Sequence, residues 1–268
     1  MKRYLVKPKS KVRLAQMSPD DPHLCPDKDK AKEEIEKWLN RLDALQEKLY
    51  AEGKRSLLIV LQGMDTAGKD GVIRHVMRGV NPQSCRVVSF KQPSVEELKH
   101  DFLWRVHANV PPRGSIGIFN RSHYEDVLVT RVHGQISHST ARQRYKEIRH
   151  FETLLTHSGT QLVKFFLHIS KKEQRERLQA RLDDPHKHWK FNAADLKERD
   201  KWKAYQKVYE ETLGQTSTKE APWYIIPADR KWYRNWLIAK ILVDLLENMH
   251  LKFPESDPDI NFSKLKIK

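Results

Sequence analysis

The chain has 268 residues and a mass of 31.7 kDa, with 38% hydrophobic and 32% charged residues. Seven Trp, eight Tyr and nine Phe argue against a disordered chain, and ten Gly without a short repeat exclude a collagen-like one. Lys and Arg number 50 against 35 Asp and Glu, a formal net charge of +15. This excess favours a polyanionic ligand such as nucleic acid, an anionic membrane surface or a polyphosphorylated substrate, although a basic surface can also lack a dedicated partner.

Neither the apolar runs nor the cysteines indicate a membrane or secreted protein. Lys240 and Asp244 interrupt the C-terminal apolar run 237–246, so no segment is predicted to span a bilayer. The basic N-terminus has no apolar run of signal-peptide length. Cys25 and Cys85 are too few for a disulfide framework and lack metal-ligand spacing. We therefore expect a soluble, cytoplasmic protein without a membrane partner.

The first 53 residues predict an arm followed by a helix. Residues 1–27 contain prolines and no sustained period, which is typical of an extended segment. From Asp27 onward, apolar residues at helical spacing predict a helix that stops at Gly53. These residues are Ile35, Trp38, Leu39, Leu42, Leu45 and Leu49.

Strand-like and helix-like segments then alternate along the chain. Five short runs are apolar and rich in β-branched or aromatic residues, as buried strands are. They cover residues 57–61, 86–90, 115–119, 162–168 and 223–226. Because helix-length segments separate them, the alternation predicts a parallel sheet with helices on both faces. No internal repeat or Gly/Ser linker divides the chain, so we expect a single α/β domain over residues 1–268.

Two stretches lie outside this predicted sheet. Residues 171–214 are helical in pattern and heavily charged, and Pro185 interrupts them, which predicts two helices hinged around residues 183–185. Residues 230–249 predict a last helix with an apolar stripe from Trp236 to Leu246. The stripe favours a place in the core, and it can extend into a subunit contact.

The most informative segment is a Gly-x4-Gly-Lys loop between a strand and a helix. The apolar strand 56–62 runs into Gly63, and a helix is predicted from Lys69 to Gly79. Gly63 and Gly68 let the backbone curl so that consecutive N–H groups point inward, and Lys69 adds a full charge at the positive end of the helix. We therefore predict a site for phosphate or nucleotide. Its loop residues are Gly63, Ala67, Gly68, Asp70 and Gly71.

Two acids distinguish this loop from the usual nucleotide-binding form. Asp70 stands where a Ser or Thr hydroxyl normally contacts magnesium, and Asp65 lies within the loop. Carboxylates in an anion cradle are explained if Mg²⁺ offsets the charge of the phosphates. The alternative for Asp65 is a cap on its own loop backbone. This alternative is less favoured, because an uncompensated carboxylate would repel phosphate.

A second group of acids follows the third predicted strand. In phosphate-loop enzymes the strand beside the loop strand often ends in a magnesium-linked Asp. This chain has Asn120 there, so the metal role is expected of Glu125 and Asp126. Ser122 is a suitable helix cap that would bring these acids back to the site. Arg121 is well placed to hold the transferring phosphoryl group. The alternative role for the two acids is to stabilise the helix dipole.

Two motifs carry a family resemblance. Residues 63–71 (GMDTAGKDG) and residues 119–127 (FNRSHYEDV) together resemble the family-2 polyphosphate kinases. Shorter matches extend the resemblance across most of the chain; they are residues 81–82, 90–93, 101–105, 181–190 and 229–234. Many members have Asp-Arg-Ser where this chain has Asn120-Arg121-Ser122. The Asn form resembles the class III branch, whose members phosphorylate both nucleoside monophosphates and diphosphates.

The resemblance implies a thymidylate-kinase-like P-loop kinase fold, with a three-layer parallel sheet and a helical lid. Residues 54–170 and 215–268 would form the core, residues 171–214 the lid, and residues 1–53 the arm and first helix. It also implies reversible transfer of the terminal phosphoryl group of inorganic polyphosphate to AMP and ADP, which forms ADP and ATP. Mg²⁺ is the implied cofactor, with Mn²⁺ as a substitute, and members associate as homodimers or homotetramers.

Direct in-line transfer without a covalent intermediate is the expected mechanism. Lys69 and the loop amides would hold the phosphoryl group, and Arg121 would stabilise charge in the transition state. Asp65 and Asp126 would hold magnesium, with Glu125 as a weaker candidate. The predicted catalytic residues are therefore Asp65, Lys69, Arg121 and Asp126. The alternative mechanism is a phosphohistidine intermediate on His123.

Other side chains are assigned to the substrates. Three basic residues of the lid would close over polyphosphate, namely Arg181, Lys187 and Lys190. Arg78, Asn81 and the stretch 90–94 are expected to contact the acceptor nucleotide. The sequence does not specify the base preference, the balance between AMP and ADP, or the direction of transfer.

Two other functions are open at this point. An ATP-dependent nucleoside monophosphate kinase has the same core and would use ATP instead of polyphosphate. A nucleic-acid-binding protein could carry the loop for ATP hydrolysis or as a vestige, and it would show tight, salt-sensitive binding to nucleic acid. No recognised nucleic-acid motif is present, so nucleic acid is not expected as a partner.

Overall fold

Five parallel strands form the centre of the molecule. The computed structural model describes residues 1–258, 265 and 267. The strands lie in the order β2-β3-β1-β4-β5; they are β1 (Ser56–Gln62), β2 (Cys85–Ser89), β3 (Ile116–Asn120), β4 (Thr160–His168) and β5 (Trp223–Pro227). Each overlaps one of the five predicted runs, and each pairing is parallel. The predicted α/β fold is therefore confirmed.

The register of the sheet brings the ends of neighbouring strands to one edge. β1 lies between β3 and β4, and Leu61 is opposite both Asn120 and Phe165. All seven residues of β1 are buried, as expected for a central strand covered on both faces. Open α/β sheets bind ligands at the carboxyl ends of their strands. The segments that follow β1 and β3 therefore meet where a ligand is expected.

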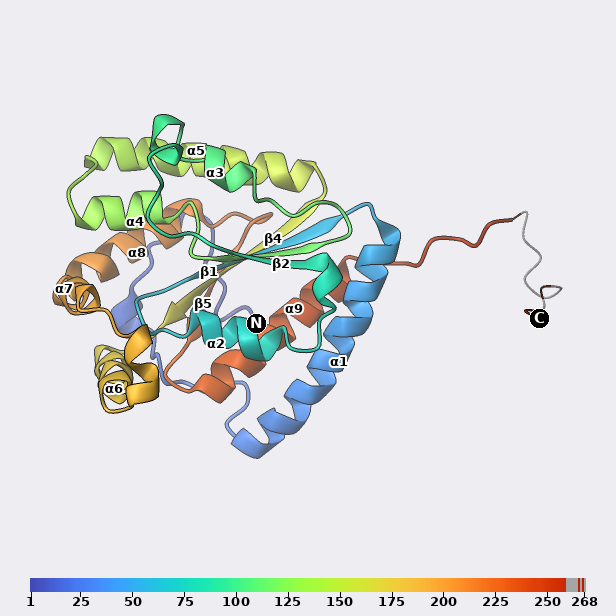
Figure 1. The fold of residues 1–268 in the computed structure, drawn as a ribbon, viewed down its shortest axis with the longest axis horizontal. Helices are drawn as coiled ribbons and strands as arrows, with labels where there is room; N and C mark the ends of the chain where they lie inside the picture. The colour runs from blue at the N-terminus through green and yellow to red at the C-terminus, as the bar shows by residue number, and fades with distance from the viewer. Residues whose placement is uncertain (259–264, 266, 268) are drawn as a thin grey trace.

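Helices cover the two faces of the sheet in separate layers (Figure 1). One layer consists of α1 (Lys28–Glu52), α2 (Lys69–Val76) and α9 (Lys231–Asn248). The other consists of α3 (Trp104–His107), α4 (Glu125–Val132), α5 (His138–His157) and α8 (Trp202–Thr216). The short 3₁₀ helices η2 (Pro82–Ser84) and η3 (Glu97–Lys99) lie on either side of β2 in the chain. The molecule thus has the three layers that were expected.

The two long helices of the first layer begin and end close to the predicted residues. The Asp27 carboxylate accepts hydrogen bonds from the N–H groups of Asp29 and Lys30, and Gly53 ends α1 with a φ of 62°. A left-handed residue at a helix end is typically glycine. In α9 the apolar stripe is buried, except that Leu245 is half-buried. The stripe therefore belongs to the core, and its extension into a subunit contact stays a prediction.

The N-terminal arm packs on the domain although its sequence predicts only an extended segment. Leu5 forms an antiparallel bridge with Tyr224, so the arm covers the β5 edge of the sheet. Four apolar residues of the arm are buried: Tyr4, Val6, Leu14 and Cys25. The 3₁₀ helix η1 (Leu14–Gln16) lies within it.

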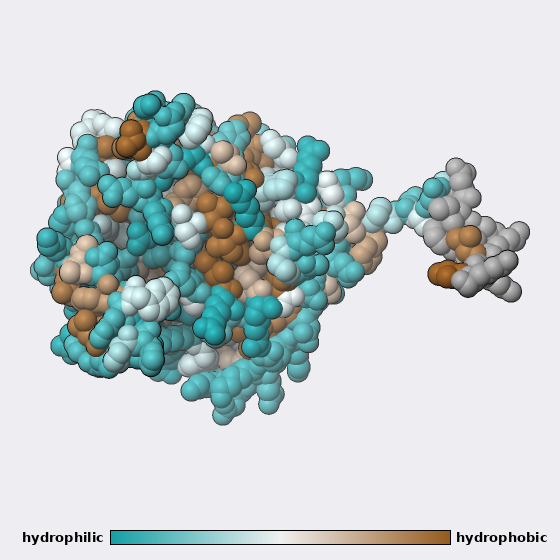
Figure 2. Space-filling model, viewed as in Figure 1, coloured by the Kyte–Doolittle hydropathy of each residue, from teal (hydrophilic) through white to brown (hydrophobic). Residues whose placement is uncertain are grey.

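The opposite edge of the sheet is more exposed. Val87 of β2 is 45% exposed. Figure 2 shows apolar residues in the middle of the face where the strands run in Figure 1, with hydrophilic residues around them. Among the described residues, no helix is both long enough and apolar enough to cross a membrane.

The charged segment 171–214 differs from the prediction of two helices. It contains α6 (Lys171–Leu182), the 3₁₀ helix η4 (Pro185–Lys190), α7 (Ala194–Asp200) and most of α8. The side chains of Asp184 and Asn192 each accept a hydrogen bond from the N–H two residues later, which starts new turns there. One face of α8 is buried against the second layer, so this helix does not lie outside the domain. The buried face includes Tyr205, Val208, Tyr209 and Leu213.

Candidate active site

The phosphate loop connects β1 to α2 and ends at the amino end of that helix. Gly68, the residue before α2, has a φ of 100°, and a Cβ there would lie 1.9 Å from Nη1 of Arg234. Backbone conformation and lack of space therefore both require glycine. The first N–H groups of a helix have no acceptor within the helix, so this end of α2 offers donors to an anion. α2 ends at Val76 and not at the predicted Gly79, because the chain turns there and Val80 bonds back to the Met77 carbonyl.

Lys69 is folded back under the loop. Its Nζ donates hydrogen bonds to the carbonyl oxygens of Gly63 (2.8 Å) and Met64 (3.4 Å). Burial and the charge of Arg121 lower the pKa of Lys69, while the charge of Asp65 acts in the opposite direction. The ammonium group is thus held by loop backbone at the position where it would neutralise an anion bound by the loop.

Arg121 joins the loop to the first turn of α4. Its Nη2 lies 2.7 Å from Oδ1 of Asp65, and its Nη1 lies 4.0 Å from Oε2 of Glu125. Although burial opposes the charged form, these two acids raise the pKa of the guanidinium. Arg121 has a φ of 62°, which is uncommon for a residue other than glycine. Such backbone strain persists only where the surrounding structure imposes it.

Glu125 and Asp126 are adjacent in sequence but have different partners. Glu125 lies near Arg121 and Lys69, and burial raises the pKa of its carboxyl despite both positive charges. Asp126 lies beside Arg105, with 3.7 Å between Oδ2 and Nη2, and burial raises its pKa as well. Successive side chains of a helix point about 100° apart, which separates the two carboxyl groups. The structure therefore brings Glu125 to the loop, whereas the predicted ranking favoured Asp126.

Asp126 instead belongs to a contact that fixes the segment after β2. Arg105 donates a hydrogen bond to the carbonyl of Lys91 (2.9 Å), and its guanidinium lies 5.5 Å from the ring centroid of Phe90. Arg144 donates to the backbone carbonyl of Asp126 (2.7 Å). The predicted acceptor-binding stretch that contains Phe90 and Lys91 is thus tied to Asp126 through Arg105.

Two more hydrogen bonds connect the loop with the turn between β3 and α4. Nδ2 of Asn120 donates to Oδ1 of Asp70 (2.7 Å), and Nε2 of Gln62 donates to Oγ of Ser122 (3.3 Å). The prediction that Ser122 caps α4 is wrong, because the helix begins three residues later with Tyr124 as its cap. The Ser122 hydroxyl accepts instead from the N–H of Tyr124 (3.2 Å) and stabilises the turn that precedes the helix.

The acids at the loop suit a hard divalent cation. Within residues 1–258, 265 and 267, no three His, Cys, Asp or Glu side chains converge as a complete metal site. Asp65 and Glu125 provide two carboxylates on either side of Arg121. Mg²⁺ commonly takes one or two carboxylates and completes its coordination with water and phosphate oxygens. The donor set therefore fits Mg²⁺ that binds together with a phosphorylated substrate.

Two arginines without a predicted role hold the phosphate loop from behind. Arg177 of α6 donates to the carbonyls of Thr66 (2.9 Å) and Ala67 (3.2 Å). Arg234 of α9 is 2% exposed, donates to the carbonyl of Ala67 (3.2 Å) and packs against Gly68. Burial and the charge of Arg177 lower the pKa of Arg234 to about 9, so the group stays charged at neutral pH. Because the loop carbonyls are bound to Arg177 and Arg234, the side of the loop away from these arginines is free to bind an anion.

The start of α6 is also attached to the loop. Gln174, three residues before Arg177, donates to the carbonyl of Asp65 (3.0 Å). Together these two side chains bind three successive loop carbonyls, those of residues 65–67. No local pattern in the charged segment distinguishes Gln174 or Arg177 from their neighbours. For Arg234, the only indication in the sequence is that residues 229–234 match the family.

Asp195 of α7 connects one of the predicted lid residues with the charges at the loop. Arg181 lies 3.6 Å from Asp195, a residue of α7. The pKa of Asp195 is raised by burial and by the charge of Asp65, and it is lowered by Arg181 and Arg121. The charges of Asp65 and Arg121 thus act on Asp195, and Arg181 is paired with that residue.

The two lid lysines lie further out, on η4. All six residues of η4 are exposed, and Trp189 is 79% exposed. Lys187 pairs with Asp184 at 2.7 Å, whereas Nζ of Lys190 lies 4.8 Å from the ring centroid of Trp189. The proposed contacts of both lysines with polyphosphate stay predictions.

The predicted acceptor residues Arg78 and Asn81 turn toward α1. Arg78 pairs with Glu36 of α1. The backbone N–H and carbonyl of Asn81 each bond to the side-chain amide of Gln46, both at 2.8 Å. The Asn81 side chain accepts from the N–H of Gln83 (2.9 Å). In this structure the two residues attach the segment after α2 to α1.

His123 is fully buried, which does not favour the phosphohistidine alternative. Its side chain is 0% exposed, and Nε2 lies 3.4 Å from Oε1 of Glu152. A nucleophile has to reach the phosphoryl group that it attacks. The geometry gives His123 a place inside the domain and no access to a substrate.

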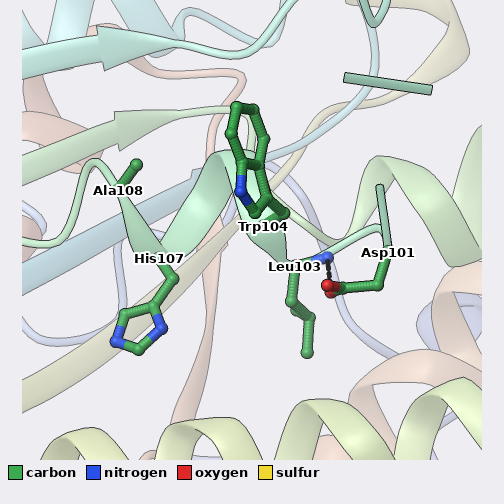
Figure 3. Close-up of a pocket in the computed structure, with 5 residues that line it drawn as sticks. All are labelled: Asp101, Leu103, Trp104, His107 and Ala108. Carbon is green, nitrogen blue, oxygen red and sulfur yellow. Dashed lines mark hydrogen bonds between the residues drawn. The ribbon is translucent and has the colours of Figure 1, made fainter. Parts of the chain in front are cut away.

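A shallow cavity lies beside α3 (Figure 3). It has a volume of ≈ 440 Å³ and is lined by Asp101, Leu103, Trp104, His107 and Ala108. Trp104 is 44% exposed and stacks on His100, with 4.1 Å between the ring centroids. None of the residues predicted to bind phosphate, metal or nucleotide lines this cavity.

The arrangement at the carboxyl ends of β1 and β3 defines the class of protein. A loop suited to phosphate, two acids suited to Mg²⁺ and an arginine between them are the parts of a phosphate-loop kinase. The sequence model of the family "Polyphosphate kinase 2 (PPK2)" matches residues 26–254. The chain belongs to this family, which confirms the resemblance inferred from the two motifs.

Relatives and a solved structure agree with this assignment. The chain is 51% identical over 258 residues to the AMP/ADP-polyphosphate phosphotransferase of Meiothermus ruber, with 96% of this chain and 97% of the relative covered. It is 48% identical over 232 residues to the ADP-polyphosphate phosphotransferase of Rhodopseudomonas palustris, with 82% and 80% covered. The crystal structure of polyphosphate kinase 2 from Arthrobacter aurescens TC1 superposes with a TM-score of 0.92 at 42% identity, and the match covers 97% and 96% of the two chains.

Proposed function

We propose that this protein transfers the terminal phosphoryl group of inorganic polyphosphate reversibly to AMP and ADP. The observation that carries the proposal is the grouping of Lys69, Asp65, Arg121 and Glu125 where β1 and β3 end. A relative with 51% identity over nearly the whole chain is named for polyphosphate and for both AMP and ADP. The net charge of +15 also suits a polyanionic donor.

In-line phosphoryl transfer needs positioned groups and charge neutralisation more than covalent chemistry. The N–H groups at the start of α2 and the ammonium of Lys69 bind the phosphoryl group that moves. Arg121 stabilises the negative charge that develops on the phosphoryl oxygens. Arg177 and Arg234 keep the loop carbonyls turned away from that group.

Asp65 and Glu125 are the proposed Mg²⁺ ligands, in place of the predicted pair Asp65 and Asp126. Arg121 keeps both carboxylates directed to the loop. The cation supplies further neutralisation of the phosphate oxygens. Mn²⁺ is expected to substitute, because carboxylate and phosphate oxygens suit both ions.

The lid consists of α6, η4 and α7 in this proposal, since α8 packs in the second layer. Its basic residues Arg181, Lys187 and Lys190 bind the polyphosphate chain and help to exclude water during transfer. The stretch around Phe90 and Lys91, fixed by Arg105, is the proposed acceptor side. Assembly as a homodimer or homotetramer and a cytoplasmic location stay predictions.

The test is an exchange of donors. The protein is incubated with Mg²⁺ and AMP, with either polyphosphate or ATP as donor, and AMP, ADP and ATP are separated over time. We expect ADP and then ATP to form from polyphosphate, and Lys69→Ala serves as the inactive control. Transfer from ATP without transfer from polyphosphate would favour a nucleoside monophosphate kinase. No transfer, together with tight and salt-sensitive binding of nucleic acid, would favour the third alternative.

A further inference from the structure

A complete ion pair lies buried inside the domain, next to the active-site turn. Nζ of Lys164, in the middle of β4, lies 2.5 Å from Oε2 of Glu152 on α5, and the two side chains are 0% and 1% exposed. The ammonium also donates to the hydroxyl of Tyr124 (2.9 Å) and to the carbonyl of Thr216 (2.8 Å). Lys and Glu are among the residues least often fully buried. All three N–H bonds of the ammonium have acceptors, which such burial requires.

Tyr124 closes this network into a ring. Its hydroxyl accepts from Lys164 and donates to Oε1 of Glu152 (2.7 Å). Burial by itself would raise the pKa of the Glu152 carboxyl, but the charge of Lys164 and the contact with His123 lower it below the usual value. The side chain of Tyr124 is therefore fixed at its far end by two charged partners.

Stability alone is a weak explanation for such a pair. Removing two charges from water costs several kcal/mol per ion, and apolar residues of similar volume are often as stable or more stable in the same place. A directed network, in contrast to apolar packing, fixes one orientation of the groups that it binds.

The residue held by the network is the one from which α4 starts. Tyr124 is the cap of α4, and the next residue is Glu125. The backbone N–H of Tyr124 donates a hydrogen bond to the Ser122 hydroxyl (3.2 Å). Arg121, on the other side of the turn, holds a left-handed backbone conformation that the surroundings have to impose.

We propose that Glu152 and Lys164 are positioning residues, which hold Tyr124 and thereby aim Arg121 and Glu125 at the phosphate loop. The network touches no substrate in this proposal and acts only through the turn. The kinetic part of the inference rests on the proposed function, whereas the structural part does not.

The test compares two buried tyrosines that each lose one hydroxyl. Tyr124→Phe removes the hydroxyl that joins Glu152 and Lys164 to the turn and leaves these two residues in place, while the longer His123–Glu152 contact (3.4 Å) is kept. Tyr145→Phe is the matched control, since Tyr145 is 1% exposed and its hydroxyl bonds, within the part of the chain that the structure describes, to Thr212 alone (3.0 Å) on α8. We expect Tyr124→Phe to lower kcat by about tenfold or more with KM values within about twofold, because displaced catalytic groups lose rate steeply. Tyr145→Phe should keep kcat within about twofold at a similar loss of Tm.

Hydrogen exchange gives a readout that needs no activity. The N–H groups of Glu125 and Asp126 bond to the carbonyls of Ser122 and His123. Exchange in the peptide covering residues 120–128 should become faster in Tyr124→Phe than in the wild type, and it should not change in Tyr145→Phe. A wild type without transfer would remove the proposed function but leave this comparison intact.

Two results would overturn the inference. One is equal behaviour of the two tyrosine variants in kcat and in exchange of residues 120–128. The other is a folded Glu152→Leu/Lys164→Met double variant with the kcat of the wild type, because apolar residues would then position the turn equally well. If the double variant does not fold, the pair of tyrosine variants still decides.

Discussion

The phosphate loop and the turn between β3 and α4 lie side by side but are shaped in different ways. The loop, residues 63–71, curls at Gly63 and Gly68 and has one further left-handed residue, Thr66, and two arginines bind its backbone carbonyls. The turn, residues 120–126, has its left-handed conformation at Arg121 and is held by the side chains of Glu152 and Lys164 through Tyr124. The loop therefore presents backbone N–H groups together with the side chains of Asp65 and Lys69, and the turn presents the side chains of Arg121 and Glu125. Charge neutralisation is thus shared by the two regions, whereas the N–H groups at the start of α2 belong to the loop.

Three contacts join the regions into one site. Asp65 pairs with Arg121 at 2.7 Å, Asn120 bonds to Asp70 at 2.7 Å, and Gln62 bonds to Ser122 at 3.3 Å. Each contact has one partner in β1 or its loop and the other in the turn. Loss of a neutral contact should therefore be milder than loss of a charged group that faces the substrate.

The largest effect is expected in the loop, at Lys69. Lys69→Ala should lower the rate of transfer by about a hundredfold or more, the size seen when one preorganised electrostatic contact is removed. The fold should survive, since only two bonds to loop carbonyls are lost. Steady-state rates and a melting curve measure both parts. Lys37→Ala, an exposed lysine on α1, is the control for loss of charge alone. Turnover of Lys69→Ala close to that of the control would contradict the assignment of the phosphate loop.

The two acids of the turn provide the next test. Glu125→Gln keeps the shape and removes the charge, so it should reduce kcat by about ten- to a hundredfold and raise the Mg²⁺ concentration needed. Asp126→Asn should mainly lower Tm, because Arg105 loses a charged partner. Asn120→Ala should be milder than Glu125→Gln, since it removes one neutral donor from Asp70.

Measuring the rate against Mg²⁺ concentration in these variants shows whether Glu125 or Asp126 is the Mg²⁺ ligand. A steeper Mg²⁺ requirement in Asp126→Asn than in Glu125→Gln would restore the ranking that the sequence suggested. It would also mean that the side chain of Asp126 turns away from Arg105 when substrate binds.

Gly68 of the loop should matter more than a positive-φ glycine in open space, such as Gly134. Gly68→Ala meets both a φ of 100° and the guanidinium of Arg234, so it should destabilise the fold by about 2–4 kcal/mol. Gly134→Ala is the matched control, because Gly134 also has a positive φ of 67° but has open space around its Cβ position. Its cost should be about 1 kcal/mol, from backbone conformation alone. If urea unfolding shows the same loss of unfolding free energy in both variants, the Arg234 side chain moves aside for the added methyl group at little cost.

The two regions also differ in how well the sequence predicts them. The loop was predicted because its determinants, Gly63, Gly68 and Lys69, lie within a few consecutive residues between a strand and a helix. The sequence did not predict which of Glu125 and Asp126 faces the loop, because this depends on the position of Arg105 beside Asp126. No spacing rule connects residues so far apart in the chain, and the same holds for Arg177 and Arg234 behind the loop.

In residues 171–214 the sequence contains local signals for the helices that the structure shows, but the prediction followed the high charge density instead. Asn192 is a typical turn-forming residue, and α8 has apolar residues at helical spacing from Tyr205 to Leu213. The density of charge in residues 171–214 nevertheless suggested one continuous lid with a single break. Five strands, by contrast, were found because each run is short, apolar and bounded by polar residues.

The smallest effect is expected at η4, where the lysines are exposed and, among the described residues, bind neither the loop nor the turn. Lys190→Ala should raise the KM for polyphosphate by about two- to fivefold, the size of an exposed ion pair, without a change in the KM for AMP. Lys187→Ala should have less effect, because Lys187 is already paired with Asp184. Arg181→Ala should in addition lower Tm, since Arg181 bonds to the Lys190 carbonyl and pairs with Asp195.

Salt dependence distinguishes binding of the polyanion from packing of the lid. Each lysine that binds polyphosphate releases counterions from the chain, so its loss should flatten the dependence of KM on salt concentration. A lysine that only packs would change Tm and leave that slope as it is in the wild type. The KM for polyphosphate is therefore measured at two salt concentrations for Arg181→Ala, Lys187→Ala and Lys190→Ala, with Lys37→Ala as the control. If none of the three differs from the control in KM or in slope, Arg181, Lys187 and Lys190 do not bind the donor. The bonds from Gln174 and Arg177 to the loop carbonyls would then remain as the structural contribution of α6 to the site.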